Sequence, residues 1–154
     1  MTQRVAYVTG GSRGIGAGIA KALAGDGYDV AISYARNEKA AEETVAEIRA
    51  MGRRAMAICC DGEGNGNRAA IQRVVRDLGR IDALVCNAGV YPHGDVSEMT
   101  DAQVDAVLGL NVRAVMIEAI EASSRSSMVF SPWPSSSSSS PEWRIGARAF
   151  RSPS

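Results

Sequence analysis

Residues 5–23 read VAYVTGGSRGIGAGIAKAL, and this stretch predicts the fold of the chain. The apolar run Val5–Val8 is typical of a strand buried in a parallel sheet. The residues Ala17–Leu23 are typical of a helix. Three glycines with the spacing G-x-x-x-G-x-G lie between them. A strand, a glycine-rich turn and a helix in this order are typical of a segment that holds the pyrophosphate of a dinucleotide.

The three glycines are Gly10, Gly14 and Gly16. A turn that brings the backbone close to a pyrophosphate leaves no room for side chains, so glycine is needed there. The helix that follows supplies free N–H groups and the positive end of its dipole, which attract phosphate. The alternative interpretation is a glycine-rich turn with only a structural role.

The chain as far as about residue 122 alternates between strand and helix patterns. This alternation predicts an α/β fold: a Rossmann-like, doubly wound parallel sheet, partial in that it has strands 1 to 4. Right-handed crossovers predict the strand order 3-2-1-4, with ligands at the carboxyl ends between strands 1 and 4. Strands are expected at 5–8, 29–33, 55–59 and 81–86, and helices at 15–24, 38–51, 67–78 and 101 to about 122, the last capped by Thr100.

Composition excludes several classes of function. The 17 basic and 17 acidic residues balance, so no overall field predicts binding to nucleic acid or to an anionic membrane. No apolar run approaches the roughly 20 residues that span a bilayer, and no signal peptide is recognised, so a cytoplasmic location is expected. The three cysteines, Cys59, Cys60 and Cys86, match no zinc spacing and are expected to be reduced thiols, and no metal site is predicted.

The composition changes abruptly near residue 122. Residues 123–154 hold 13 serines and four arginines but a single acidic residue, Glu142. Such a segment has little apolar surface to offset the entropy lost on ordering. We therefore divide the chain into a nucleotide-binding domain at 1–122 and a Ser/Pro/Arg-rich tail at 123–154 that is expected to be disordered. The tail is either a natural linker or the product of a translational frame change near residue 122.

Four motifs follow one another along the chain. They are the turn Thr9–Gly16, Asp61 after strand three, Asn87-Ala88-Gly89 after strand four, and Asn111 in the last helix. Together they resemble the motifs of the short-chain dehydrogenase/reductase family, classical type. The resemblance covers about residues 4–122, and within the family the chain is most similar to 3-oxoacyl-[acyl-carrier-protein] reductases. Two positions depart from the family pattern: Cys86 replaces the first Asn of an Asn-Asn-Ala-Gly motif, and Gly62 replaces an apolar residue.

The resemblance implies an oxidoreductase that acts on a small-molecule carbonyl or secondary alcohol. It implies that the carboxylate of Asp61 meets the adenine amino group, and that Asn111 supports a catalytic proton relay. A homo-oligomer is expected for the complete fold. The resemblance assigns the cofactor to Thr9, Gly10, Ser12, Arg13, Gly14, Ile15, Gly16, Asp61, Asn87, Ala88 and Gly89.

The end of the second strand favours NADP(H) over NAD(H). NAD enzymes place a carboxylate there, against the ribose 2′-hydroxyl. Here the segment Ser33–Arg36 contains no acidic residue, and Arg36 and Arg13 are suited to a 2′-phosphate. Arg36 is therefore added to the cofactor-binding residues. The alternative interpretation is that Arg36 is an exposed loop charge, and the nearby Glu38 is the residue that argues against NADP(H).

The family's proton-transfer pair, a Tyr with a Lys four residues later, is not found in the sequence. The residues four positions after Tyr7, Tyr28, Tyr34 and Tyr91 are Gly, Ile, Glu and Asp. Without a nearby cation, a Tyr pKa near 10 is too high for proton transfer at neutral pH. The chain alone is therefore expected to be inactive, which favours a frame change. The alternatives are a non-catalytic dinucleotide-binding module, a pseudogene relic and a scaffold without a ligand.

Overall fold

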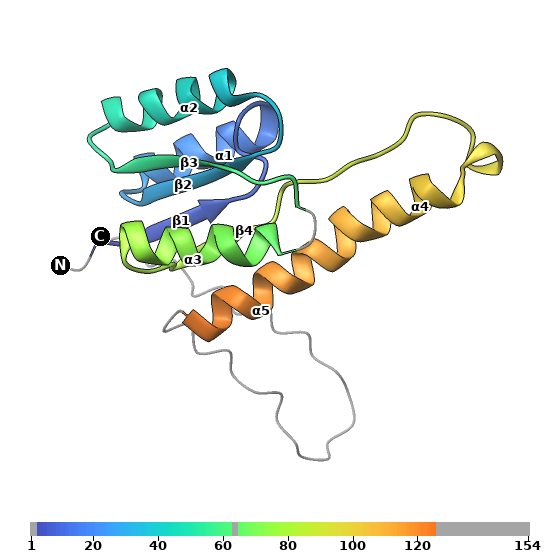
Figure 1. The fold of residues 1–154 in the computed structure, drawn as a ribbon. Helices are drawn as coiled ribbons and strands as arrows, with labels where there is room; N and C mark the ends of the chain where they lie inside the picture. The colour runs from blue at the N-terminus through green and yellow to red at the C-terminus, as the bar shows by residue number, and fades with distance from the viewer. Residues whose placement is uncertain (1–2, 63–64, 126–154) are drawn as a thin grey trace, which may run out of the picture.

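A computed structural model describes residues 3–62 and 65–125 of the 154-residue chain. It has a parallel four-stranded sheet in the order β3-β2-β1-β4, which confirms the predicted topology (Figure 1). Its strands are β1 (Val5–Val8), β2 (Asp29–Tyr34), β3 (Ala55–Cys59) and β4 (Ala83–Val85).

Helices cover both faces of the sheet (Figure 1). One face packs on α1 (Gly14–Gly25) and α2 (Glu38–Ala50). The other packs on α3 (Gly66–Leu78) and the end of α5 (Val115–Arg125). A 3-10 turn at Val96–Glu98, helix α4 (Asp101–Leu108) and a π-helical segment at Gly109–Ala114 connect β4 to α5.

The two cores explain why the first strand is apolar throughout. Val5 and Tyr7 point into the core beneath α3, whereas Val8 points into the core beneath α2, and all three are at most 1% exposed. Because successive side chains of a strand point to opposite faces, a strand with helices on both sides has no solvent-facing position. Burial on both faces therefore produces a continuous apolar run instead of an alternating one.

The structure corrects the predicted length of the fourth strand. The fourth strand is three residues long, at Ala83–Val85, instead of 81–86. On its N-terminal side the Asp82 carboxylate accepts a hydrogen bond from the N–H of Val5, and on its C-terminal side Asn87 binds the glycine-rich turn. These side-chain contacts add to the backbone hydrogen bonds at the two ends of the strand, from the N–H of Asp82 to the Val5 carbonyl and from the N–H of Thr9 to the Val85 carbonyl.

The long helix predicted from residue 101 is found, and it runs without a break to Arg125, with a π-helical stretch inside it (Figure 1). Thr100 caps it as predicted, in a capping box with Gln103. The helix then changes to π-helical geometry over Gly109–Ala114 before α5 continues to Arg125. Within this segment the side chain of Asn111 is bound to the backbone of Val90. Such π segments are frequent at functional sites.

The predicted boundary at residue 122 falls inside α5, which runs on to Arg125. The prediction of disorder for the rest of the tail, residues 126–154, lies outside the described residues. Over residues 3–62 and 65–125, the helices are all too short or too polar to cross a bilayer.

Candidate functional site

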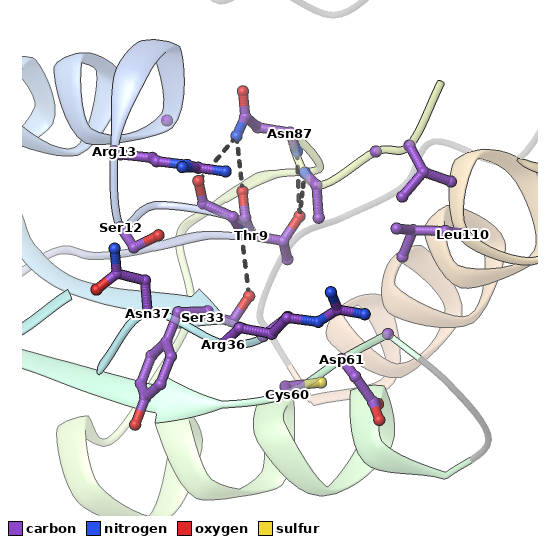
Figure 2. A pocket seen from close by; sticks show the side chains of 18 of the residues that line it. Thr9, Ser12, Arg13, Ser33, Arg36, Asn37, Cys60, Asp61, Asn87 and Leu110 are labelled. Atoms are coloured by element: carbon purple, nitrogen blue, oxygen red, sulfur yellow. Dashed lines mark hydrogen bonds between the residues drawn. The ribbon is translucent and has the colours of Figure 1, made fainter. Parts of the chain in front are cut away.

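A cavity of about 570 Å³ opens at the carboxyl ends of the strands (Figure 2). The turn after β1 and the segments after β2, β3 and β4 all contribute to its wall. The twelve residues that sequence analysis assigned to a cofactor all lie in this wall. They are Thr9, Gly10, Ser12, Arg13, Gly14, Ile15, Gly16, Arg36, Asp61, Asn87, Ala88 and Gly89.

The glycine-rich turn has a backbone that other residues do not readily adopt. Gly10 has φ 65° and Gly14 has φ 56°, both in the left-handed region that favours glycine. Gly16 is required for a different reason, because a Cβ there would overlap the carbonyl oxygen of Gly10 and the amide of Asn87. No atom lies within 4 Å of a Cβ built on Gly14, so at that position the turn faces open space.

Two buried side chains hold the turn in place. The N–H of Gly10 donates to Ser33 Oγ at 3.2 Å, and the N–H of Gly11 donates to the Ser33 carbonyl at 2.9 Å. Thr9 Oγ1 accepts from the N–H groups of Asn87 and Ala88, both at 3.1 Å. Ser33 and Thr9 are 3% and 2% exposed, so the turn rests on rigid strand ends.

The first turn of α1 is arranged to attract an anion. The residue that precedes it, Arg13, makes no side-chain capping hydrogen bond, and the described first turn contains no acidic residue. The unpaired N–H groups and the helix dipole therefore face the cavity with a net positive potential. Arg36 reaches toward the cavity from the end of β2 (Figure 2). Ile15, which is 77% exposed, adds an apolar surface to the same wall.

The end of the cavity next to β3 contains a short polar chain of contacts. The Cys60 thiol donates to Asn67 Oδ1 at 3.2 Å, and Asn67 Nδ2 donates to the Gly62 carbonyl at 3.2 Å. Burial raises the pKa of the Cys60 thiol, so this group stays protonated at neutral pH. Asp61 and Leu110 line the same end.

Sequence analysis missed a buried carboxyl group in the wall. Glu118 of α5 is 3% exposed. Burial raises the pKa of its carboxyl group, and the hydrogen bond from Cys86 lowers that pKa by a smaller amount. Burial and the contact with Glu118 raise the pKa of Cys86 to about 12, so Cys86 is a neutral donor. A Glu in an amphipathic helix normally faces solvent, so the sequence pattern of this helix did not indicate that Glu118 is buried.

Other wall residues were also missed, among them Ser33, Cys60, Asn67, Val90 and Leu110. Most of them lie one or two positions from a residue that was assigned to the site, so their proximity in sequence to these residues could have indicated them.

Asn111 does not line this cavity. Its side-chain amide donates to the Val90 carbonyl at 2.8 Å, and its Oδ1 accepts from the Val90 N–H at 2.9 Å. The side chain therefore links the π-helical segment to the loop after β4. The role of Asn111 in a proton relay stays a prediction.

Comparison with known proteins identifies similar chains. The model of the family described as short chain dehydrogenase matches residues 4–127. Hydroxynaphthalene reductase of Aspergillus fumigatus is 45% identical over 120 residues, which are 77% of this chain and 44% of that protein. A 3-oxoacyl-[acyl-carrier-protein] reductase of Staphylococcus epidermidis is 40% identical over 111 residues, 71% of this chain and 46% of that one.

A solved structure agrees with both the fold and the sequence. A short-chain dehydrogenase of Burkholderia cenocepacia in complex with NADP is 46% identical, with a TM-score of 0.78 over 81% of this chain and 52% of that chain. The present chain therefore spans about half the length of the proteins that it matches.

Proposed function

Because the chain belongs to the short chain dehydrogenase family, we propose that its cavity binds NADP(H). The chain then supplies the nucleotide-binding part of an oxidoreductase that acts on a carbonyl or a secondary alcohol. The observation that carries the proposal is the glycine-rich turn, which faces the cavity directly in front of the first turn of α1.

The residues around the turn fit a pyrophosphate. Gly14 faces open space, and Gly16 lets the helix start close to Gly10, so phosphate oxygens can approach the backbone N–H groups of α1. Ser12 adds a hydroxyl donor at the same edge of the cavity. Hydrogen bonds between Thr9 and Asn87 join the turn to the opposite wall of the site.

The charges at the end of β2 support NADP(H) over NAD(H). Arg36 and Arg13 line the cavity there, whereas the segment Ser33–Asn37 contains no carboxylate. A guanidinium group forms paired, charge-assisted hydrogen bonds with phosphate, and a carboxylate in this place would repel it. The nearest acidic residue in the sequence, Glu38, is in the first turn of α2 and is not part of the cavity wall.

The reaction that we propose is the reduction of a 3-oxoacyl thioester or a similar carbonyl, by analogy with the reductase of Staphylococcus epidermidis. Bound nicotinamide supplies the hydride chemistry. The sequence of 154 residues has no Tyr with a Lys four positions later. We therefore propose that this chain binds the cofactor but does not turn over substrate by itself.

Calorimetric titration of the full 154-residue chain with NADPH and NADH tests the proposal. Saturable binding with a lower Kd for NADPH is expected. Failure of both dinucleotides to bind at millimolar concentration would contradict cofactor binding. Equal Kd values would contradict the assignment of the arginines to a 2′-phosphate.

A turnover assay with acetoacetyl-CoA and NADPH tests the proposed inactivity. No oxidation of NADPH above background is expected at any enzyme concentration. A rate of about 1 s⁻¹ or more, within the ordinary range of enzymes, would show that this chain carries another proton donor.

A further inference from the structure

A row of large apolar side chains lies on the outer side of the long helical stretch. The row runs through α4, the π-helical segment and α5, with one member at every fourth residue. Each member is between 40% and 61% exposed. We call this row the apolar stripe, and its members are Val104, Leu108, Val112, Met116 and Ile120.

The π-helical segment keeps the stripe on one side of the helix. In an α-helix, each step of four residues turns about 40° too far, so a long row at this spacing winds around the axis. The wider π-helical turn over Gly109–Ala114 takes up more residues and reverses part of this drift. The opposite side of the stretch is buried at Ala114, Glu118 and Ala122. The stripe is therefore a continuous apolar face that points away from the sheet.

Helix α4 has little packing of its own. It projects beyond the sheet, in line with α5 (Figure 1). None of the eight described residues of α4 is buried. A helix this short is marginal in water without tertiary packing, and a continuous exposed apolar face marks a contact surface. We therefore looked for the part of the molecule that covers the stripe.

Carboxylates lie beside the stripe at its α4 end. Residues 81–112 include five acidic residues and no Lys or Arg. Two of the five, Asp101 and Asp105, are exposed on α4, one helical turn apart. In the described part of the chain, neither carboxylate takes part in an ion pair. A cover that matches this surface is both apolar and cationic.

The sequence after α5 contains one segment of this kind. Residues 143–151 read WRIGARAFR, with three arginines and no carboxylate. At helical spacing, apolar residues at i, i+4 and i+7 share one face, and the three arginines share the face next to it. The two sets are Trp143, Ala147 and Phe150, and Arg144, Arg148 and Arg151.

The chain between α5 and this segment is long enough to reach the stripe. From Arg125 back to Val104, the helical stretch measures about 30 Å at 1.5 Å per residue. Residues 126–142 span up to about 55 Å when extended at 3.3 Å per residue. Residues 143–151 can therefore lie along the stripe in either direction.

We propose that residues 143–151 dock on the apolar stripe of the same chain. Trp143 and Phe150 contact the stripe, and the arginines lie beside Asp101 and Asp105. A segment that is too poor in apolar residues to fold alone can order on a surface that supplies the missing contacts. A short flexible tether gives an effective concentration on the order of millimolar, which favours docking within one chain.

Tryptophan fluorescence of the full chain tests the proposal. Both tryptophans of the chain, Trp133 and Trp143, follow α5, so the Trp133→Phe variant reports on Trp143 alone. Docking is expected to shift the emission of Trp143 to shorter wavelength and to protect it from acrylamide, compared with the same variant unfolded in urea. Emission and quenching equal to those of the unfolded chain would overturn the proposal.

Substitutions in the stripe locate the docking surface in the Trp133→Phe chain. Leu108→Ser combined with Met116→Ser is expected to release Trp143, which shifts its emission to longer wavelength and strengthens quenching. Met51→Ser is the matched control, because Met51 is 49% exposed at the end of α2 and lies outside the stripe. Its emission is expected to stay unchanged. An equal shift with both sets of substitutions, or with neither, would overturn the site.

Neutralised carboxylates test the arginine contacts. Asp101→Asn combined with Asp105→Asn is expected to weaken the protection of Trp143 at low salt and to remove most of its dependence on salt. Glu42→Gln combined with Glu43→Gln removes two exposed carboxylates from α2 and is expected to change neither. A salt dependence that survives loss of the two aspartates would overturn their pairing with the arginines.

The dependence on protein concentration separates the tail from a second copy as the cover. Docking within one chain is expected to give the same Trp143 emission at every concentration, including those at which sedimentation velocity shows only monomer. Protection of Trp143 that appears only as the chain dimerises would overturn docking within one chain and would assign the stripe to a second copy.

Discussion

Thr9 and Asn87 bind each other from two strand ends that are far apart in sequence. The backbone N–H of Asn87 donates to Thr9 Oγ1 at 3.1 Å, and Asn87 Nδ2 donates to the Thr9 carbonyl at 3.0 Å. The same amide also reaches the Gly10 carbonyl at 3.2 Å. The ends of β1 and β4 are therefore joined by side chains where the strand ladder stops. This contact sets the distance between the glycine-rich turn and the opposite wall of the cavity.

Replacing Thr9 by Val is expected to destabilise the chain by about 1–3 kcal/mol, because two N–H groups lose their acceptor in a site with little access to water. Thr9→Ser keeps the hydroxyl oxygen and is the matched control, expected to lose much less. Urea unfolding followed by circular dichroism measures both free energies. A loss of stability for Thr9→Ser without a loss for Thr9→Val would mean that the methyl group, and not the hydrogen bonds, stabilises the junction.

Gly16→Ala and Gly18→Ala are expected to have opposite effects, although both glycines lie in the first turns of α1. A Cβ on Gly16 would overlap the Gly10 carbonyl, so this variant is expected to unfold at a lower temperature and to lose NADPH binding. A Cβ on Gly18 meets no atom within 4 Å. Since Ala is favoured over Gly inside a helix by about 0.5–1 kcal/mol, Gly18→Ala is expected to raise Tm.

Scanning calorimetry and NADPH titration of these two glycine variants measure the contrast. A loss of Tm of the same size in both would mean that α1 tolerates no added methyl group, and that the close approach of Gly16 to Gly10 is not special.

Arg36→Ala is expected to weaken NADPH binding about tenfold or more and to leave NADH binding unchanged. The loss corresponds to one charge-assisted contact of about 1.5–3 kcal/mol. Arg76→Ala is the control, because the Arg76 side chain is 70% exposed on α3 and takes no part in the cavity. The two dinucleotides are compared at low and at physiological salt. A parallel loss for NADH would place Arg36 against a group that both cofactors share.

Glu118→Gln is expected to flatten the pH dependence of stability above pH 4.5. Burial raises the pKa of Glu118 above its ordinary value of 4.5, so the folded state keeps this proton after the unfolded chain has lost it. The free energy of unfolding therefore falls as pH rises through that window. Urea unfolding from pH 4 to pH 8 measures the slope, and an unchanged slope in the variant would contradict a buried, protonated Glu118.

Glu121→Gln is the control with the opposite sign. Hydrogen bonds from Arg125, Gln72 and Arg68 lower the pKa of Glu121. Its contribution to stability is therefore present above the unfolded pKa and is lost as pH falls through the lowered folded pKa. Removing this carboxylate is expected to reduce stability near neutral pH and to weaken the loss of stability in acid.

The order of the strands and the site at their carboxyl ends could be predicted because their signals are local. Apolar runs such as Val5–Val8 reflect burial on both faces, and the glycine spacing reflects a single tight turn. The handedness of crossovers then leaves few ways to arrange four parallel strands. The twelve residues assigned to a cofactor line one cavity because they lie in the segments that follow the four strands, and parallel strands end at one edge of the sheet.

The sequence by itself therefore determined the class of fold, the strand order and the edge of the sheet at which a ligand fits. Only the tertiary structure decided that Glu118 is buried against Cys86, that Asn111 binds Val90 and that Leu110 occupies the space beside Gly62. These contacts depend on how the helices after β4 are rotated and placed against the sheet. Helical periodicity specifies a face but not its neighbour, because the neighbour is set by packing between segments that are distant in the chain.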